Sequence, residues 1–487
     1  MQITLRGIKA GTNECVTLVI EATPHSRVGA VATNFAATHL HARGIVSISR
    51  DTVAVDPTAV VDDALERDAV YDVVLKPDRD EDASTASPYW VDAQCLDQIR
   101  WRDPRSGVAC FDEAPCERFD VGDPRGYAYL EEHGYVVFRE VLAEPEVRKA
   151  TALFWDFMES RGASCVRHTD AHGDEEIRRV DRRDPGSWHW VANPINGLIG
   201  VPGIGQSAFL WYARTRPRVL EAFSRFWDLP EDTPEARAAA LLTSFDGCCA
   251  FRPWRIDRRW RTLPGWWHVD QNSRGAQPRG GKRAVQGLVS LTQASPATGG
   301  FCVIPGSHLR HDRVCAASPS TVQGPGHFVP LRGDSPEVRG ATARFVACEA
   351  GDLICWDSRT IHCSLPAFSE NGASGSDFLR LCAYVCMSPR RVASPDVLRQ
   401  RLLGFHAEAT TSHWPDDWAV SIAGAGYRRE LRDLPCPRLA ARLVGWTDEQ
   451  VRQLFATDDR PDADMPAHPQ MSTEMLVEPA LVEPALA

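Results

Sequence analysis

A His-x-Asp motif and a distant third ligand-type residue constrain the fold of this chain more than any other feature. The motif is His268-Val269-Asp270, and the distant residue, His362, follows the apolar segment Leu353–Trp356. Residues two apart on an extended strand point to the same face, so His268 and Asp270 can bind the same ion. His362 can join them only from a different strand. The pattern therefore predicts a cupped β-structure in which two distant strands meet.

The residue types in this pattern are those of an iron centre. Two imidazoles and one carboxylate on one face of a metal leave the opposite positions open, as non-haem Fe(II) oxygen activation requires. A lone His-x-Asp more often forms a capped turn or a surface pair. Here Gly351-Asp352, His362-Cys363-Ser364 and Arg380 follow in order, and an arginine can match the far carboxylate of 2-oxoglutarate with two hydrogen bonds. The ordered set favours a metal site.

Several segments in the same order resemble the phytanoyl-CoA dioxygenase family. They are Glu132–Arg139, Trp267–Asn272, Phe301–His308 and the stretch from Gly351 to Arg380. The resemblance spans about residues 122 to 420. It implies an α+β protein whose catalytic domain is a double-stranded β-helix of the jelly-roll or cupin type with flanking helices. It also implies Fe(II) and 2-oxoglutarate as cofactors.

The same resemblance assigns the site residues. His268, Asp270 and His362 would be the catalytic iron ligands, and Ser364 and Arg380 would bind the distal carboxylate of 2-oxoglutarate. Related iron halogenases replace the carboxylate ligand by a small residue so that chloride can take its place. Because Asp270 is present, hydroxylation is the expected outcome.

Two assignments near the site have alternatives. Arg380 follows His362 after a long gap in which Ser369–Asp377 reads as an inserted loop, and Arg359 is the nearest competitor for the carboxylate. His308 ends a Pro-Gly turn and is interpreted as a turn residue rather than a ligand. The remaining histidines lack partners at ligand spacing and are interpreted as ordinary surface or core residues, among them His168, His172, His189 and His413.

Three further features bear on the substrate and its surroundings. Arg252 and Arg255 could meet an anionic substrate, or could pair with Asp246 and Asp257. The arginine pairs 178–179, 182–183 and 258–259 are expected on solvated faces, with a CoA or phosphate contact as the alternative. The tryptophans beside the motifs would help to exclude water if they line the pocket, or would simply be core aromatics: Trp266, Trp267 and Trp356.

Composition narrows the class of protein. The net charge of -11 argues against nucleic-acid binding, which needs concentrated positive charge. The 15 cysteines form no Cys-x-x-Cys pair, which favours buried free thiols in a reducing compartment. The start lacks a basic segment followed by an apolar run, and no apolar stretch approaches the roughly 20 residues that span a bilayer. A soluble, cytoplasmic protein is expected.

The organisation of the chain predicts four parts. Residues 1–78 alternate as strand, strand, helix and strands, and resemble ubiquitin-like β-grasp domains; the chain continues into Lys76-Pro77-Asp78 without the Gly-Gly tail used in conjugation. Residues 79–121 are a polar linker or extension, and residues 122–457 are the catalytic domain. The repeated Val-Glu-Pro-Ala-Leu tail in 458–487 is expected to be disordered.

Within the catalytic domain, hydrophobic spacing predicts a first strand at Tyr135–Phe138 and a helix near Glu144–Met158 with Pro145 at its start. Further helices are expected near Pro217–Phe226, Pro389–Leu403 and Thr447–Phe455, and further strands at Leu288–Leu291, Phe301–Ile304, Leu353–Trp356 and Leu379–Val385.

The leading hypothesis is an Fe(II)- and 2-oxoglutarate-dependent dioxygenase that uses O2 to hydroxylate a small organic substrate, lipid or acyl-CoA-like compounds included. Succinate and CO2 would be released. Two rivals stay open: a hydroxylase of protein side chains that finds its partner through the ubiquitin-like domain, and a catalytically idle adaptor.

Overall fold

The computed structural model describes most of the chain between residues 116 and 456 and a set of strands before it. Side chains are described for 116–161, 180–188, 191–193, 195–263, 266–274, 281–282, 284–317, 327–331, 335–338, 341–367, 377–424 and 426–456. The backbone alone is described for 2–8, 15–21, 45–50, 53–54, 70–75, 100–102, 109–111, 167–169, 175–177 and 189–190.

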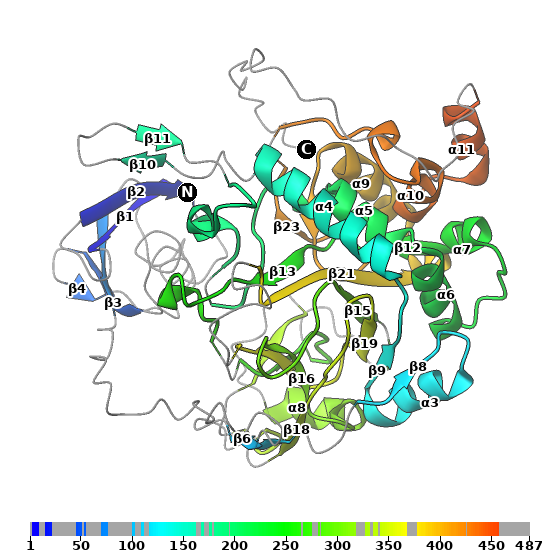
Figure 1. Ribbon diagram of the computed structural model, residues 1–487, viewed down its shortest axis with the longest axis horizontal. Helices are drawn as coiled ribbons and strands as arrows, with labels where there is room; N and C mark the ends of the chain where they lie inside the picture. The colour runs from blue at the N-terminus through cyan, green and yellow to red at the C-terminus, as the bar shows by residue number, and fades with distance from the viewer. Residues whose placement is uncertain are drawn as a thin grey trace.

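Two seven-stranded sheets form the centre of the catalytic domain (Figure 1). The first sheet has the order β12 (Leu241–Thr243), β21 (Arg380–Pro389), β15 (Val285–Ser290), β19 (Leu353–Asp357), β9 (Tyr135–Phe138) and β8 (Arg118–Phe119), with β13 (Cys248–Phe251) also paired to β21. The second sheet has the order β17 (Val329–Pro330), β14 (His268–Val269), β20 (His362–Leu365), β16 (Gly300–Val303), β18 (Thr342–Phe345), β7 (Ala109–Phe111) and β6 (Arg100–Arg102).

Two runs of three successive strands alternate between the two sheets. β14, β15 and β16 lie in the second, first and second sheet, and β19, β20 and β21 lie in the first, second and first. This alternation is the connectivity of a jelly-roll or double-stranded β-helix, in which inward-facing residues from both sheets share one interior. Facing aromatic rings fill part of that interior, since Phe301 of β16 lies 4.6 Å from Trp356 of β19 between ring centroids.

Helices cover the outer side of the first sheet. α4 and α5 lie over the region of β21 (Figure 1). The first long helix buries Val147, Ala150, Phe154 and Phe157, the stripe that its spacing predicted. The helices are α3 (Pro124–His133), α4 (Glu144–Arg161), α5 (Ala208–Arg214), α6 (Pro217–Phe226), α7 (Pro234–Ala240), α8 (His311–Ala317), α9 (Pro395–His406), α10 (Pro437–Val444) and α11 (Asp448–Leu454).

One predicted helix boundary was wrong. The helix expected from Pro389 begins instead at Pro395, because β21 continues to Pro389 and the side chain of Ser394 caps the helix by accepting from the Val397 N–H. A proline in the first turn and a serine before it are a common helix start. A 3-10 turn at Arg390–Val392 fills the interval.

The N-terminal strands form a separate five-stranded sheet of order β2-β1-β5-β3-β4, with β1 (Gln2–Ile8) antiparallel to β2 (Cys15–Glu21) and parallel to β5 (Val70–Leu75). The other two strands are β3 (Ile45–Arg50) and β4 (Val53–Ala54). The helix expected around Val28–Phe35 lies outside the described residues, and so does the tail from 458. The ubiquitin-like assignment and the tail's disorder therefore stay predictions.

The stretch expected to connect the N-terminal part to the catalytic domain also contributes strands. β7 pairs in parallel with β18, and β6 pairs with β7, so both extend the second sheet. A further hairpin joins β10 (Arg167–Thr169) to β11 (Glu175–Ile177), and β22 (Thr410–Thr411) pairs with β23 (Val420–Ile422). None of the described helices is both long enough and apolar enough to cross a bilayer.

Thiol burial matches its prediction. All cysteines whose side chains are described are buried. Several of them lie on β13 and β21 within the core: Cys248, Cys249, Cys382 and Cys386.

Gly351 offers a stability test of the turn that starts β19. Its φ is +93°, and an added Cβ would lie 2.2 Å from the carbonyl oxygen of Leu142. Gly351→Ala is therefore expected to lower the free energy of unfolding by about 2–4 kcal/mol, from both backbone strain and steric overlap. The measurement is the midpoint of urea unfolding.

Gly200→Ala is the matched control, because nothing lies within 4 Å of its added Cβ. It should change stability by no more than about 0.5 kcal/mol. Equal midpoints for the two variants would show that the turn does not require glycine.

Candidate iron and 2-oxoglutarate site

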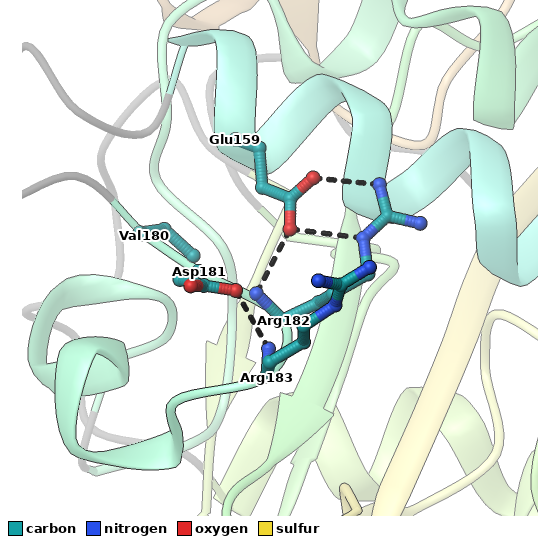
Figure 2. A pocket seen from close by; sticks show the side chains of 5 residues that line it. All are labelled: Glu159, Val180, Asp181, Arg182 and Arg183. Carbon is teal, nitrogen blue, oxygen red and sulfur yellow. Dashed lines mark hydrogen bonds and ion pairs between the residues drawn. The ribbon is translucent and has the colours of Figure 1, made fainter.

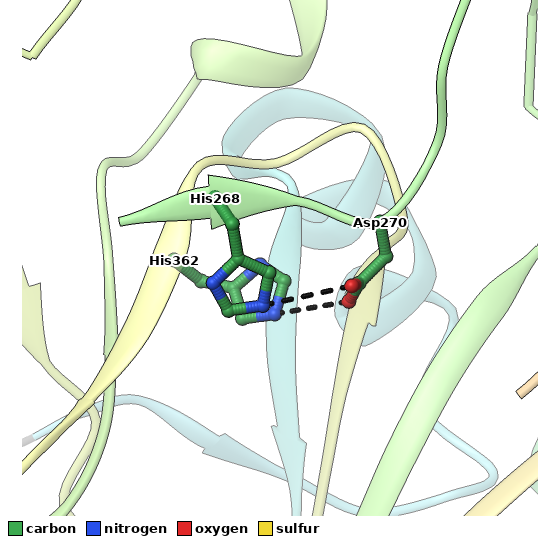
Figure 3. A group of neighbouring side chains, drawn as sticks. All are labelled: His268, Asp270 and His362. Carbon is green, nitrogen blue, oxygen red and sulfur yellow. Dashed lines mark ion pairs between the residues drawn. The ribbon is translucent and has the colours of Figure 1, made fainter. Parts of the chain in front are cut away.

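The three residues predicted as metal ligands meet in space (Figure 3). His268 on β14 and His362 on β20 are directly opposite each other in an antiparallel pair. Asp270 follows β14, and its carboxylate oxygens lie 3.5 Å from His268 Nε2 and 3.2 Å from His362 Nε2. One ligand atom from each of the three lies within 4.8 Å of the others, so a single ion could contact all three.

Hydrogen bonds to the backbone fix both imidazole rings. His268 Nδ1 lies 3.0 Å from the carbonyl oxygen of Trp266, and His362 Nδ1 lies 2.9 Å from that of Thr360. Since a carbonyl oxygen only accepts, each Nδ1 carries the proton and each Nε2 is left with its lone pair. Metal-binding histidines are usually held by such a bond from the second ring nitrogen.

Asp270 is held from two sides. Its backbone N–H donates to the carbonyl oxygen of Ser358 at 2.9 Å, and the Gln286 amide donates to its carboxylate Oδ2 at 2.7 Å. Gln286 belongs to β15 of the first sheet, so it reaches the ligand set from across the interior. Sequence reasoning missed this residue because nothing in its local pattern sets Gln286 apart.

The protonation states of the cluster suit a cation. Burial lowers the pKa of His268 to about 3, and the neighbouring His362 ring acts in the same direction. Burial alone would raise the pKa of Asp270, but the adjacent imidazoles of His268 and His362 hold that pKa well below the ordinary value. A neutral imidazole and an ionised carboxylate are the forms that bind metal.

Aromatic rings surround the two histidines. Trp266 stacks on His268 at 4.7 Å between centroids and an interplanar angle of 9°. Phe301 and Trp356 lie 5.3 Å and 5.4 Å from the His362 ring. Two imidazoles and a carboxylate in an apolar enclosure fit a resident Fe(II) with open coordination positions.

Arg380, which the sequence predicts to bind the distal carboxylate of 2-oxoglutarate, lies in the interior beside Ser364. It is 2% exposed, its Nη1 donates to Ser364 Oγ at 3.1 Å, and its guanidinium lies 5.1 Å from the centre of the Phe251 ring. Among the residues with described side chains, no carboxylate forms an ion pair with it. A buried guanidinium whose near partners are neutral can accept an anionic ligand.

Arg359, the competitor, has a partner already. Its Nε and Nη2 donate to the two carboxylate oxygens of Asp357 at 2.8 Å and 2.7 Å. These two hydrogen bonds occupy the Nε–Nη2 edge of the guanidinium, so that edge is not available to the carboxylate of 2-oxoglutarate.

Other groups singled out in the sequence lie apart from this cluster. His308 bonds the carbonyl oxygen of Glu131 through Nε2 at 3.0 Å, in keeping with a structural role in its turn. Arg252 donates to the carbonyl oxygen of Trp188 at 2.9 Å and lies 4.6 Å from the centre of the Trp260 ring.

A hollow of about 560 Å³ lies at the residues preceding Pro185 (Figure 2). Arg182 lines it and pairs with the carboxylates of Glu159 and Asp156 at 2.6 Å and 2.7 Å. The positive charge of Arg182 is thus balanced within the protein, which favours a structural role over a phosphate contact.

Comparisons with known proteins point to one family. Residues 260–373 match the sequence model of phytanoyl-CoA dioxygenase (PhyH). Ava biosynthesis cluster protein O of Aspergillus versicolor is 28% identical over 253 residues, which are 50% of this chain and 75% of that protein. A Dictyostelium discoideum protein named as a phytanoyl-CoA dioxygenase is 22% identical over 280 residues, 50% of this chain and 71% of its own length.

The structure of EvdO2 from Micromonospora carbonacea var. aurantiaca, complexed with 2-oxoglutarate, aligns at 18% identity and a TM-score of 0.33, covering 54% of this chain and 89% of that one. The segment matched by the family contains His268, Asp270 and His362. Residues 260–373 are therefore similar to the phytanoyl-CoA dioxygenase family, and the protein is an iron(II)- and 2-oxoglutarate-dependent oxygenase.

Proposed function

We propose that the protein hydroxylates a small organic substrate and releases succinate and CO2. His268, Asp270 and His362 hold the iron, and Arg380 and Ser364 hold the distal carboxylate of 2-oxoglutarate. The observation that carries this proposal is the convergence of three buried ligand atoms within 4.8 Å of one another.

The side chains prepare the site for a metal and a dianion. Backbone acceptors keep Nε2 of both histidines unprotonated, and Asp270 supplies one negative charge against the two positive charges of Fe(II). The remaining charge favours a chelating dianion, and Arg380 balances the far carboxylate. When bound, the iron supplies the oxygen chemistry that no protein side chain can perform.

The carboxylate of Asp270 favours hydroxylation over halogenation. It is ionised and held by Gln286, so it fills the position that a halide ligand would need. The rings of Trp266, Phe301 and Trp356 contribute by keeping bulk water away from the reacting centre.

Gln286 tests how the protein orients Asp270. Gln286→Leu removes the 2.7 Å bond to Oδ2, and loss of a bond that orients a metal ligand typically weakens metal binding by about 10- to 100-fold. Anaerobic titration with Fe(II) measures the change. Gln293→Leu is the control, since Gln293 bonds only the exposed Glu349 and should leave iron affinity unchanged. Equal affinities for the two variants would remove Gln286 from the site.

The proposed function has a direct test. Anaerobic addition of Fe(II) and 2-oxoglutarate to the full chain should give a weak metal-to-ligand charge-transfer band in visible light. With O2 and a panel of small metabolites, at least one compound should raise succinate formation and appear as a hydroxylated product. Absence of both the band and the succinate would contradict the proposal.

The N-terminal part belongs to the same proposal as a ubiquitin-like module at residues 1–78, followed by the extension at 79–121, the catalytic domain at 122–457 and the tail at 458–487. Deleting residues 1–78 should leave turnover of a small substrate intact. A protein-hydroxylating enzyme would instead lose its target, and an idle adaptor would lose its partner without ever forming succinate.

A further inference from the structure

Two polar side chains beside the iron residues have no role in the proposed iron or 2-oxoglutarate site. Asp246 lies in the turn between β12 and β13, and His413 follows β22. Backbone bonds bring these segments together, because Thr411 N–H donates to the carbonyl oxygen of Phe245 at 3.0 Å and Phe245 N–H donates to Thr411 Oγ1 at 3.2 Å. Asp246 follows Phe245 directly, and His413 lies two residues after Thr411, so both lie close to this contact between the two segments.

The segment in contact with His413 lies next to the iron residues. Ser244 N–H donates to the carbonyl oxygen of Cys386 at 2.7 Å, and Cys386 is paired in register with Gln286, which bonds the Asp270 carboxylate. The Nε2 atom of His413 is hidden from solvent and has no hydrogen-bond partner among the residues that the structure describes. A buried imidazole nitrogen without a partner costs free energy unless a ligand supplies one.

The carboxylate of Asp246 belongs to the turn that contacts the His413 segment. One oxygen accepts from the Gly247 N–H at 2.7 Å, and no cationic side chain forms an ion pair with it among the described residues. The nearby Arg214 donates instead to the backbone carbonyls of Gly205 and Asp246, both at 2.6 Å. Burial raises the pKa of Asp246, so an enclosed donor would stabilise its ionised form.

This pair lies apart from the cosubstrate arginine. The Gly247 carbonyl oxygen accepts from the Tyr384 N–H at 3.1 Å. Asp246, the residue before Gly247, therefore lies beside the part of β21 that contains Tyr384. Arg380 is four residues away on that strand, a separation of about 13 Å at roughly 3.3 Å per residue. A 2-oxoglutarate carboxylate held at Arg380 therefore leaves Asp246 and His413 available to a second ligand.

We infer that Asp246 and His413 bind a hydrogen-bond donor of the substrate, either an ammonium or a hydroxyl group, and so position its carbon skeleton beside the iron residues. The inference rests on the proposed function and narrows its substrate class. It selects a small molecule with an amine or hydroxyl substituent over a plain hydrocarbon or a ketone. Both residues are positioning residues in this role.

Three probes that share one ring test this inference: cyclohexylammonium, cyclohexanol and cyclohexanone. Each is titrated into the anaerobic complex of the full chain with Fe(II) and 2-oxoglutarate, and its Kd is read from the change in the charge-transfer band. The two donors should bind more tightly than the ketone. Asp246→Asn should weaken cyclohexylammonium by about 10- to 100-fold and cyclohexanol by only about 3- to 10-fold, because a bond to a charged group is stronger.

The partner variant is His413→Phe, which should weaken both donors, while His413→Gln should restore most of the loss because an amide can still accept and donate. Asp396→Asn is the control, since Asp396 is exposed on α9 and pairs with Arg399. All of these variants should keep the Kd for 2-oxoglutarate.

Three results would overturn the inference: ketone binding as tight as donor binding, Kd values unchanged in both variants, or an intact charge-transfer band that no probe alters. Loss of the band in the unsubstituted protein would instead contradict the proposed function itself, so the two failures are distinguishable.

Discussion

His362→Ala is expected to abolish stable Fe(II) binding and to lower succinate formation by at least about a thousandfold, because residues that act as one unit fail together when one is removed. The alanine leaves His268 and Asp270 with only two ligand positions. It also removes the ring that lies 3.2 Å from the Asp270 carboxylate. Iron binding is measured by anaerobic titration, and succinate is measured in the presence of O2.

His308→Gln is the matched control for this variant. His308 is also buried and also bonded to a backbone carbonyl, but its Nε2 faces Glu131 rather than the cluster. Iron affinity should therefore stay near that of the unsubstituted protein. Retention of iron by His362→Ala, or an equal loss in both variants, would remove His362 from the ligand set.

Arg380→Ala is expected to weaken 2-oxoglutarate binding by roughly a hundredfold or more, since loss of one partner of a buried charge pair costs about 3 kcal/mol. Iron binding should persist, because the three ligand atoms do not contact the guanidinium. Arg380→Lys should recover only part of the affinity, since an ammonium keeps the charge but lacks the two-point fork. The Kd for 2-oxoglutarate is read from the charge-transfer band of the anaerobic complex.

Arg359→Ala separates the two arginines that the sequence left in competition. Arg359 is bound at both carboxylate oxygens of Asp357, so its removal should leave the Kd for 2-oxoglutarate unchanged. A reversed result, with tight binding in Arg380→Ala and weak binding in Arg359→Ala, would reassign the cosubstrate site.

The sequence was sufficient for those barrel elements that have strong local signals. Tyr135–Phe138 was predicted to the residue, and the helix at Pro217–Phe226 was as well. Both have strong local signals, namely four buried positions in a row and a proline at the helix start. The misplaced start of α9 shows the limit, since the continuation of β21 to Pro389 depends on its pairing with Leu241 of β12.

The sequence by itself determined the types and order of the groups at the candidate site: two imidazoles, one carboxylate and an arginine at spacings suited to strands. Only the tertiary structure decided which of these groups meet and which others join them. Gln286 reaches Asp270 from a strand of the other sheet, and the segments that carry Asp246 and His413 meet through backbone bonds between Phe245 and Thr411. Local spacing encodes the face on which a side chain lies, but the contact of two faces depends on how the whole chain packs.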